Sequence, residues 1–241
     1  MLESKKESNE SPEAFYGLPQ EVQFCRLCVI SNQRPNSTVE HQNVRSAEKS
    51  TIAIDEDGVC DACRMAQRKR SRVDWGEREK ALGELCDRHR RSDGRYDCLV
   101  PGSGGKDSFY QAHLLKYEYG MHPLTVTWAP HLYTDWGRRN HQAWIDAGFD
   151  NYLCTPNSRV HRLLTRLSVE NLFHPFQVFI IGQKSMGPKM AAMFDIPLVM
   201  YGENEAEYGN PIKDNESAKR DYVYFSTEDQ SKIFLGGTSV Q

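Results

Sequence analysis

From residue 96 onward, short apolar runs alternate with longer amphipathic stretches, and this alternation restricts the fold more than any other feature of the sequence. Strands that are separated by helices form parallel sheets, because each helix returns the chain to the edge where the previous strand began. We therefore predict an α/β domain. The expected strands span 96–100, 124–128, 151–154 and 196–201, and the expected helices span 108–119, 136–147, 159–171 and 177–194.

Length allows one such domain together with a small additional module. The chain has 241 residues, which is too short for two full α/β domains. We expect a disordered leader over 1–20, a cysteine-bearing module over 21–73, and the α/β domain over 74–241. That domain is expected to begin with a helix over 74–92.

Charge and hydropathy argue against two classes of partner. The formal net charge of -3 gives no general attraction for nucleic acid. The basic run at 68–72 is interpreted as a solvated helix face, and a phosphate-contacting patch is the alternative. Residues 1–11 are polar, and no apolar run is long enough to span a bilayer. We therefore expect a cytoplasmic protein that does not contact membranes.

A Gly-rich turn joins the first expected strand to the helix that follows it. Such a turn can offer backbone N–H groups and a helix N-terminus to an anion. The glycines are expected to allow close approach and positive φ, the lysine to add charge, and the aspartate to hold Mg²⁺. A turn that only caps the helix is the alternative. The residues are Ser103, Gly104, Gly105, Lys106, Asp107 and Ser108.

The turn matches neither the Walker A spacing nor the dinucleotide-binding fingerprint. It resembles the Ser-Gly-Gly-x-Asp-Ser signature of the PP-loop ATP pyrophosphatases, which cleave ATP between the α- and β-phosphates. The resemblance implies a Rossmann-like PP-loop fold with ATP and Mg²⁺ as cofactors. It also implies that the turn holds the leaving pyrophosphate, that Lys106, Asp107 and Ser108 are catalytic, and that the backbone near Thr127 faces the adenine.

Four of the seven cysteines form two Cys-x-x-Cys pairs, Cys25 with Cys28 and Cys60 with Cys63. Two such turns complete a tetrahedral site with no open position, so a structural Zn²⁺ is expected. Residues 31–50 must then form a loop or an extra hairpin, and a strand is expected at 52–54. Buried thiols without a metal are the alternative. The three remaining cysteines are interpreted as small core residues: Cys86, Cys98 and Cys154.

A second group of polar residues directly follows the last expected strand. Open parallel sheets bind ligands at the carboxyl ends of their strands. Carboxylates and amides at that edge suit Mg²⁺ or a polar substrate, whereas an acidic surface loop is the alternative. We assign Gly202 to ATP. The residues assigned to substrate or Mg²⁺ are Glu203, Asn204, Glu207 and Tyr208.

The order of these motifs resembles a narrower family. A Cys-x-x-Cys pair followed by Asn-Gln-Arg-Pro at 32–35, a second pair behind Asp57 and Gly58, the Gly-rich turn and the polar group at 202–209 all occur in the N-acetyl sugar amidotransferases. These enzymes act in bacterial surface-polysaccharide synthesis, which includes the lipopolysaccharide O-antigen. The similarity extends over about residues 22–210.

This resemblance implies a reaction in two stages. ATP adenylates the acetamido oxygen of a nucleotide-linked sugar, and ammonia then displaces AMP and leaves an acetamidino group. An amide oxygen is a poor leaving group, so conversion to an adenylate is chemically sensible. No Gly-x-Cys-x-Gly elbow is present, so a separate glutaminase subunit is expected to supply the ammonia. Members of the family generally continue well past Gln241, and part of the sugar pocket is expected in such a continuation.

Two other readings stay open at this level. The first is a PP-loop tRNA-modifying enzyme of the thiolase type, against which the acidic net charge argues. The second is a non-catalytic, zinc-bearing interaction protein. The presence of both Lys106 and Asp107 argues against that loss of catalysis.

Overall fold

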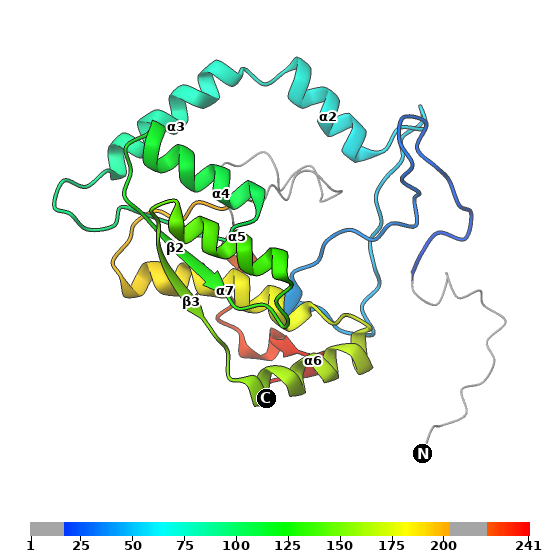
Figure 1. The fold of residues 1–241 in the computed structure, drawn as a ribbon. Helices are drawn as coiled ribbons and strands as arrows, with labels where there is room; N and C mark the ends of the chain where they lie inside the picture. Colours follow the sequence, from blue (N-terminus) through cyan, green and yellow to red (C-terminus); the bar gives the residue numbers. More distant parts are fainter. Residues whose placement is uncertain (1–16, 203–220) are drawn as a thin grey trace. The chain divides into compact units, whose positions relative to one another are not determined.

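The computed structural model describes residues 17–202 and 221–241 and divides the chain into two compact units. Among the described residues, the smaller unit contains 17–38 and 46–73. The larger unit contains 39–45, 74–202 and 221–241 (Figure 1). Residues 39–45 therefore belong to the larger unit, although they lie between the two cysteine pairs in sequence.

The larger unit is built on a parallel sheet of three strands in the order β1-β2-β3. The strands are β1 (Cys98–Pro101), β2 (Pro123–Trp128) and β3 (Asp150–Cys154). Val199 lies beside Leu99 on the free side of β1 in a parallel bridge, and Met200 N donates to Leu99 O at 2.9 Å. The strand expected at 196–201 is thus limited to one bridge, at Val199.

Alternate residues of β1 point into two separate hydrophobic cores, as the two-residue period of a strand requires. Leu99 packs with Leu124, Val126, Met190, Ala191 and Ile196 on the face covered by α7 (Gln177–Met193). The opposite core joins Cys98 and Val100 to three helices. These are α3 (Trp75–His89), α4 (Lys106–His113) and α5 (Asp135–Asp146), which contribute Cys86, Ala112 and Trp144.

The helices of the α/β alternation lie close to where the sequence predicts them. Helix α4 continues into a π-helical turn, η2 (Leu114–Glu118), and ends before Gly120, which has φ 62°. Helix α5 ends before Gly148, which has φ 89°. Positive φ at these two positions favours glycine, so the predicted helix ends are confirmed. Asn157 caps α6 (Ser158–Leu172) by accepting from two backbone N–H groups.

Strands β2 and β3 share a buried polar ladder. Thr125 and Thr127 are buried, and the side-chain amide of Asn151 donates to both hydroxyl oxygens at 3.0 Å. His141 Nε2 lies 3.2 Å from Asn151 Oδ1 and completes the network. β3 is the edge strand, and Tyr152 and Leu153 on it are exposed.

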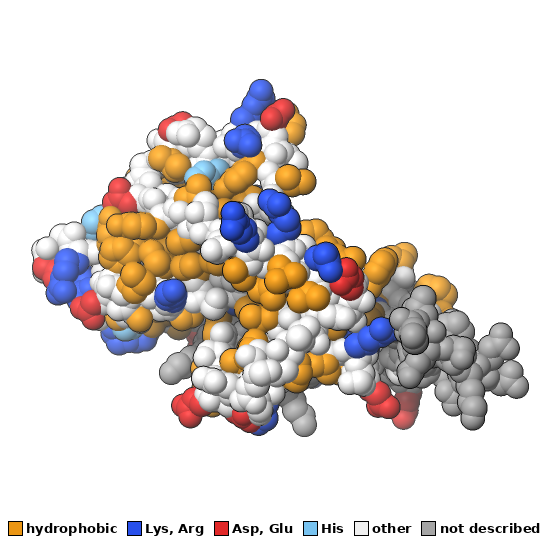
Figure 2. Space-filling model, turned by 90° about the horizontal axis from the view of Figure 1, so that it is seen from below, with side chains coloured by type: hydrophobic (Ala, Val, Ile, Leu, Met, Phe, Trp, Pro, Cys, Tyr) orange, Lys and Arg blue, Asp and Glu red, His pale blue; other side chains and the backbone are white. Residues whose placement is uncertain are grey.

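The face of the larger unit seen in Figure 2 carries broad areas of hydrophobic side chains.

A buried glutamine joins three segments that are distant in sequence. Gln177 Nε2 donates to Glu40 O at 2.8 Å, and Gln177 Oε1 accepts from Gly236 N at 2.8 Å. Glu40 lies in a short 3-10 helix, η1 (Glu40–Gln42). Gly236 lies in the turn between β4 (Phe234–Leu235) and β5 (Thr238–Ser239), an antiparallel hairpin that the sequence analysis does not predict.

The smaller unit contains α2 (Asp61–Ser71) and a small core around the cysteines. Within its described residues the backbone pairs through isolated bridges, Phe24 with Ser31, Pro35 with Thr51 and Ile54 with Cys60. The strand expected at 52–54 is therefore reduced to bridge positions. The predicted helix face at 68–72 lies at the end of α2, where positive charge complements the helix dipole.

Candidate functional site

The turn after β1 is shaped by two glycines that leave no room for a side chain. A Cβ on Gly102 would lie 2.5 Å from Ser108 Oγ and 2.8 Å from Trp144 Cη2. Gly104 has φ 81°, and a Cβ there would lie 2.4 Å from Asn140 O on α5. Both glycines therefore let the turn pack tightly against neighbouring helices.

Gly105 differs from both of them. Its φ is -65°, so the positive φ expected at this position is wrong. A Cβ on Gly105 would meet only Ser103 Oγ, at 4.0 Å. Because sterics do not require glycine here, the missing side chain leaves open space next to the first turn of α4. That space is of the kind a bound anion would fill.

The N-terminus of α4 faces this space without a capping side chain. Gly105 is the N-cap and supplies no side-chain hydrogen bond. Ser108 is buried, and its Oγ donates to Gly105 O at 3.2 Å. Lys106 Nζ lies 2.7 Å from Asp107 Oδ1, and both side chains are exposed. Among the described residues, the N-cap of α4 thus supplies no side-chain cap to the first helical turn, and a cation and a carboxylate lie beside that turn.

Gly202 follows the segment that pairs with β1 at Val199, and it lies against the same first turn of α4. A Cβ on Gly202 would lie 2.8 Å from Ser108 N and 2.9 Å from Ser108 Cα. The carbonyl of Tyr201 accepts from Gln111 Nε2 at 3.0 Å. The structure therefore brings Gly202 together with the turn after β1. The predicted residues Glu203, Asn204, Glu207 and Tyr208 lie outside the described residues.

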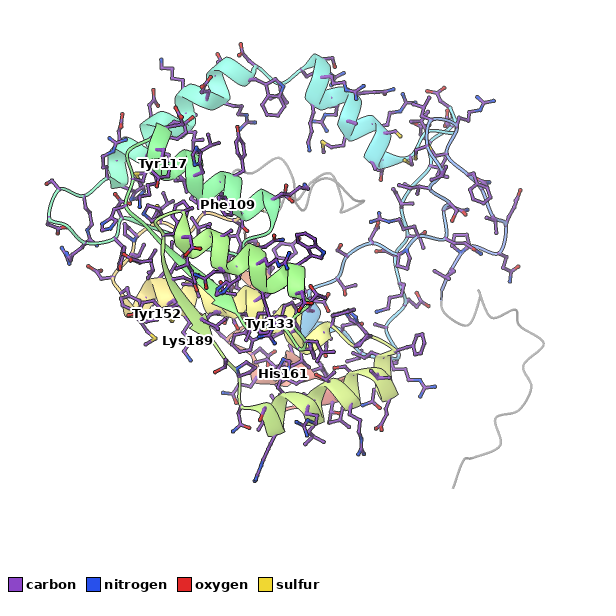
Figure 3. The ribbon with its side chains drawn as sticks, in the orientation of Figure 1. Phe109, Tyr117, Tyr133, Tyr152, His161 and Lys189 are labelled. Atoms are coloured by element: carbon purple, nitrogen blue, oxygen red, sulfur yellow. The ribbon has the colours of Figure 1, made fainter. Side chains whose placement is uncertain are left out.

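An open groove with a volume of about 470 Å³ adjoins the turn. Gly104 lines it from the turn, Asn140 contributes from α5, and α4 provides the other lining residues: Lys106, Phe109, Tyr110 and His113. The ring of Phe109, labelled in Figure 3, packs edge-on against Phe149.

Thr127 is placed differently from the other predicted nucleotide residues. Its side chain is buried in β2, and its hydroxyl oxygen accepts from Asn151 Nδ2. The side chain therefore belongs to the ladder between β2 and β3. The nearest link to the Gly-rich turn is through the strand, where Gly102 N donates to Val126 O at 2.9 Å.

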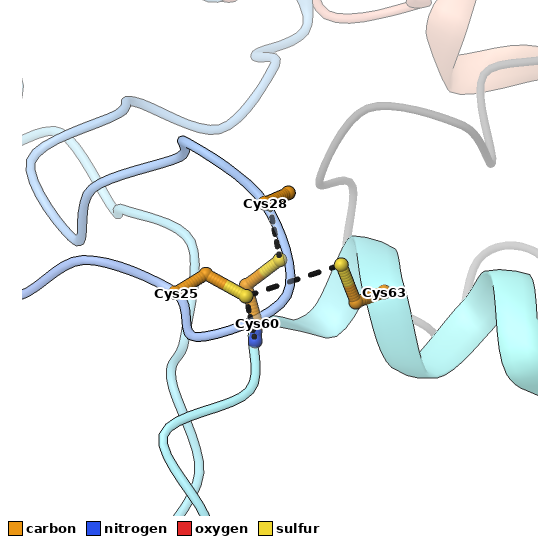
Figure 4. A group of neighbouring side chains, drawn as sticks. All are labelled: Cys25, Cys28, Cys60 and Cys63. Atoms are coloured by element: carbon orange, nitrogen blue, oxygen red, sulfur yellow. Dashed lines mark hydrogen bonds between the residues drawn. The ribbon is translucent and has the colours of Figure 1, made fainter.

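The four cysteines of the two Cys-x-x-Cys pairs form one cluster (Figure 4). All four sulfur atoms lie within 4.8 Å of one another. Cys25 Sγ lies 3.9 Å from Cys63 Sγ, and Cys28 Sγ lies 3.7 Å from Cys60 Sγ. A tetrahedral site with zinc–sulfur bonds of about 2.3 Å requires sulfur atoms about 3.8 Å apart. The donor set and its spacing therefore fit a metal ion such as zinc.

Backbone N–H groups support the sulfur of Cys25. Cys60 N donates to Cys25 Sγ at 3.3 Å, and Leu27 N donates to it at 3.4 Å. Burial alone would raise the pKa of Cys25, but these hydrogen bonds together lower its pKa to about 6. Burial and the neighbouring thiols raise the pKa of Cys63 to about 12. The hydrogen bonds therefore favour the thiolate form of Cys25.

The other cysteines lie outside this cluster. Cys86 and Cys98 are completely buried in the core beside α3 and β1, and burial raises the pKa of both thiols. Their interpretation as core residues is confirmed. Cys154 is partly buried at the end of β3, and burial raises its pKa as well.

A group of rings that sequence reasoning did not single out lies at the carboxyl end of β2. The indole of Trp128 lies 6.3 Å from the ring of His161 on α6, and His131 lies 4.7 Å from His161. Figure 3 labels His161, which belongs to α6. The available signal was the position of Trp128 at the end of a predicted strand and of His131 shortly after it, where α/β sheets bind ligands.

The described residues define a mixed α/β protein with a parallel sheet and a cysteine cluster suited to a metal ion. Within the part of the chain that the structure describes, the helices are too short or too polar to cross a membrane. No protein-family model matches the sequence, and a comparison with curated proteins gives no match.

Proposed function

We propose that this protein is an ATP-dependent amidotransferase with a Rossmann-like PP-loop fold. The observation that carries the proposal is the N-terminus of α4, where Gly105 supplies no side-chain cap and leaves open space. Gly202 packs against the same helical turn. Val199 pairs with β1 where a fourth strand of the sheet would lie. The spatial order is therefore β3, β2, β1 and then the segment at Val199. In sheets of this order, ligands bind where the order reverses, between the first and fourth strands.

The residues at this edge fit the phosphates of ATP. The backbone N–H groups of the first turn of α4 and the helix dipole would hold an anion in the space beside Gly105. Lys106 would add positive charge, and the Asp107 carboxylate would hold Mg²⁺ if it turned from Lys106 to the metal. Ser108 is tied to Gly105 O and would keep the turn in shape.

The reaction that these groups support is activation of an oxygen as an adenylate. An acetamido oxygen of a nucleotide-linked sugar attacks the α-phosphorus of ATP, and pyrophosphate leaves into the cradle. Ammonia then adds to the activated carbon, AMP departs, and the acetamidino product remains. Among the residues of this chain, the cradle and Lys106 stabilise the leaving pyrophosphate, so no covalent nucleophile is needed. A separate glutaminase would supply the ammonia, and zinc at the four cysteines would hold the smaller unit together.

The proposal is tested by the products of Mg²⁺-dependent turnover. The full chain is incubated with ATP, ammonium salt and a panel of nucleotide-linked N-acetyl sugars, and the products are separated by chromatography. AMP, pyrophosphate and an acetamidino sugar are expected, and Asp107→Ala should remove most of the AMP. Asp93→Ala serves as control, because Asp93 is an exposed aspartate that pairs with Arg95. ADP as the main product, or sulfur transfer to tRNA in its place, would reject the proposal.

A further inference from the structure

The ring cluster at the end of β2 consists of Trp128, His131, His161, Phe176 and Phe179. His131 is its centre, with ring centroids 4.7 Å from His161, 5.5 Å from Phe179 and 6.3 Å from Phe176. Phe176 is 57% exposed, so the cluster reaches the surface on that side. Its inner part lies against α7, where a Cβ on Gly182 would be only 2.3 Å from Trp128 Cε2. The indole is therefore fixed in position by close packing.

Two ring nitrogens inside this cluster are buried without a partner. Trp128 Nε1 and His161 Nε2 are both shielded from solvent, and neither has a hydrogen-bond partner among the described residues. An indole N–H can only donate a hydrogen bond. Leaving a buried polar group unpaired costs about 1–3 kcal/mol, so two such groups at one place call for an explanation.

The hydrogen bonds around the cluster limit the roles of the two histidines. Thr165 Oγ1 donates to His161 O at 2.8 Å, which uses its only proton. The contact of 3.1 Å between His131 Nε2 and the same hydroxyl therefore has His131 as donor. Burial first, and then the nearby His131, lower the pKa of His161. A neutral imidazole can present its Nε2 as an acceptor.

We propose that Trp128 and His161 bind the amide of the acceptor substrate, with the indole N–H donating to the carbonyl oxygen and His161 Nε2 accepting from the amide N–H. The apolar wall of Phe179 and Phe176 would receive the acyl methyl group. This proposal rests on the proposed function, since it places the acetamido group that is to be activated. A carboxylate brings no proton for His161, and an ammonium ion brings no acceptor for Trp128, whereas a neutral amide brings both.

Entry of an amide to this site would require His131 to move aside. His131 is on the exposed surface and lies against His161, and its contact with Thr165 is a single hydrogen bond. Rotation of exposed side chains takes picoseconds to nanoseconds. His131 would therefore cover the two nitrogens in the free protein and turn aside when the amide enters.

The test uses the zinc-loaded full chain with ¹⁵N-labelled tryptophan, whose four indole N–H signals are assigned by single Trp→Phe variants. N-methylacetamide is titrated as the probe, and N,N-dimethylacetamide, which lacks the N–H, as its matched control. The Trp128 signal should shift in a saturable way, with about fivefold weaker binding of the dimethyl compound, the effect of one hydrogen bond. The signal of Trp136, which is 71% exposed on α5, should stay in place.

His161→Phe keeps a ring at this position and should make the two compounds bind equally. Equal shifts at Trp128 and Trp136, or unchanged discrimination in His161→Phe, would overturn the inference. These results are separable from the proposed function. Saturable binding at Trp128 without AMP formation would reject the proposed amidotransferase activity but support the amide-binding site. AMP formation by a chain whose Trp128 ignores both amides would remove the site alone.

Discussion

Gly104 and the Asn140 carbonyl oxygen are so close that a Cβ on the glycine would lie 2.4 Å from that oxygen. The next residue, Gly105, has open space at the same position. Two adjacent glycines in one turn therefore have different reasons to be glycine. Gly104 is required by packing and by its φ of 81°, whereas Gly105 is required only if a ligand occupies the space beside it.

This contrast predicts opposite results for two alanine variants. Gly104→Ala should lower the free energy of unfolding by about 2 kcal/mol or more, because of positive φ and the backbone clash. Gly105→Ala should change it by less than about 0.5 kcal/mol, yet reduce AMP formation about a hundredfold by blocking the cradle. Urea unfolding and the AMP assay measure the two effects. Full activity of Gly105→Ala would show that no phosphate lies beside Gly105.

The cysteine cluster predicts about one zinc per chain. Cys60 is completely buried. Loss of a group that only supports a metal ligand weakens metal binding by up to about a hundredfold. Cys60→Ser removes a ligand itself, so it should weaken zinc binding by more than about a hundredfold. Cys154→Ser, outside the cluster, is the control and should keep its zinc. Metal content by mass spectrometry and thermal unfolding report the outcome. Equal zinc in both variants would contradict a four-cysteine site.

The sequence predicts the α/β alternation and the cysteine cluster because both depend on local patterns. Apolar runs such as that ending at Trp128 mark strands, and glycines such as Gly120 mark helix ends. Local patterns do not reveal partners distant in sequence. The insertion of residues 39–45 into the larger unit, and the β4–β5 hairpin held by Gln177, depend on such partners.

The candidate site is predicted in the same uneven way. The turn from Ser103 to Ser108 can be found because a strand and a helix flank it in sequence. The different roles of Gly104 and Gly105 cannot be found, since only the position of Asn140 on α5 separates them. His161 was missed because a single histidine on a helix carries no signal until the end of β2 is placed beside it.

Gln177 predicts a measurable loss of stability. Gln177→Ala would leave Glu40 O and Gly236 N buried without their partner, so the free energy of unfolding should fall by roughly 2–5 kcal/mol. Gln142→Ala on the exposed surface of α5 should change it by less than about 0.5 kcal/mol. Urea unfolding compares the two. If both variants were equally stable, the contacts of Gln177 would not support the larger unit.

His41 predicts how stability depends on pH. It is 6% exposed, and burial, followed by the charge of Lys184, lowers its pKa from the usual 6.5. Below about pH 6.5 the unfolded chain therefore binds a proton that the folded chain resists, so stability is present above this pH and is lost as the pH falls. Burial lowers the pKa of His161 as well, so its contribution to stability is also lost as the pH falls.

Thermal unfolding between pH 7.5 and 5 is the measurement. The stability of His41→Leu should depend less steeply on pH than that of the natural chain. The aspartates with lowered pKa, such as Asp55 and Asp93, act only below about pH 4 and do not interfere. An unchanged slope in His41→Leu would exclude this histidine as the source.

The bond from Gln177 to Glu40 also fixes an order of events during synthesis on the ribosome. The two residues are 137 positions apart, which takes about 7–27 s to translate at about 5–20 residues per second. All four clustered cysteines are made before residue 64, so metal can bind before β1 exists. The hydrogen bond to Glu40 O can form only after Gln177 of α7 has been made. The bond from Gly236 needs a further 59 residues of synthesis. The nascent chain can thus complete its metal centre before the contacts of Gln177 close its larger unit.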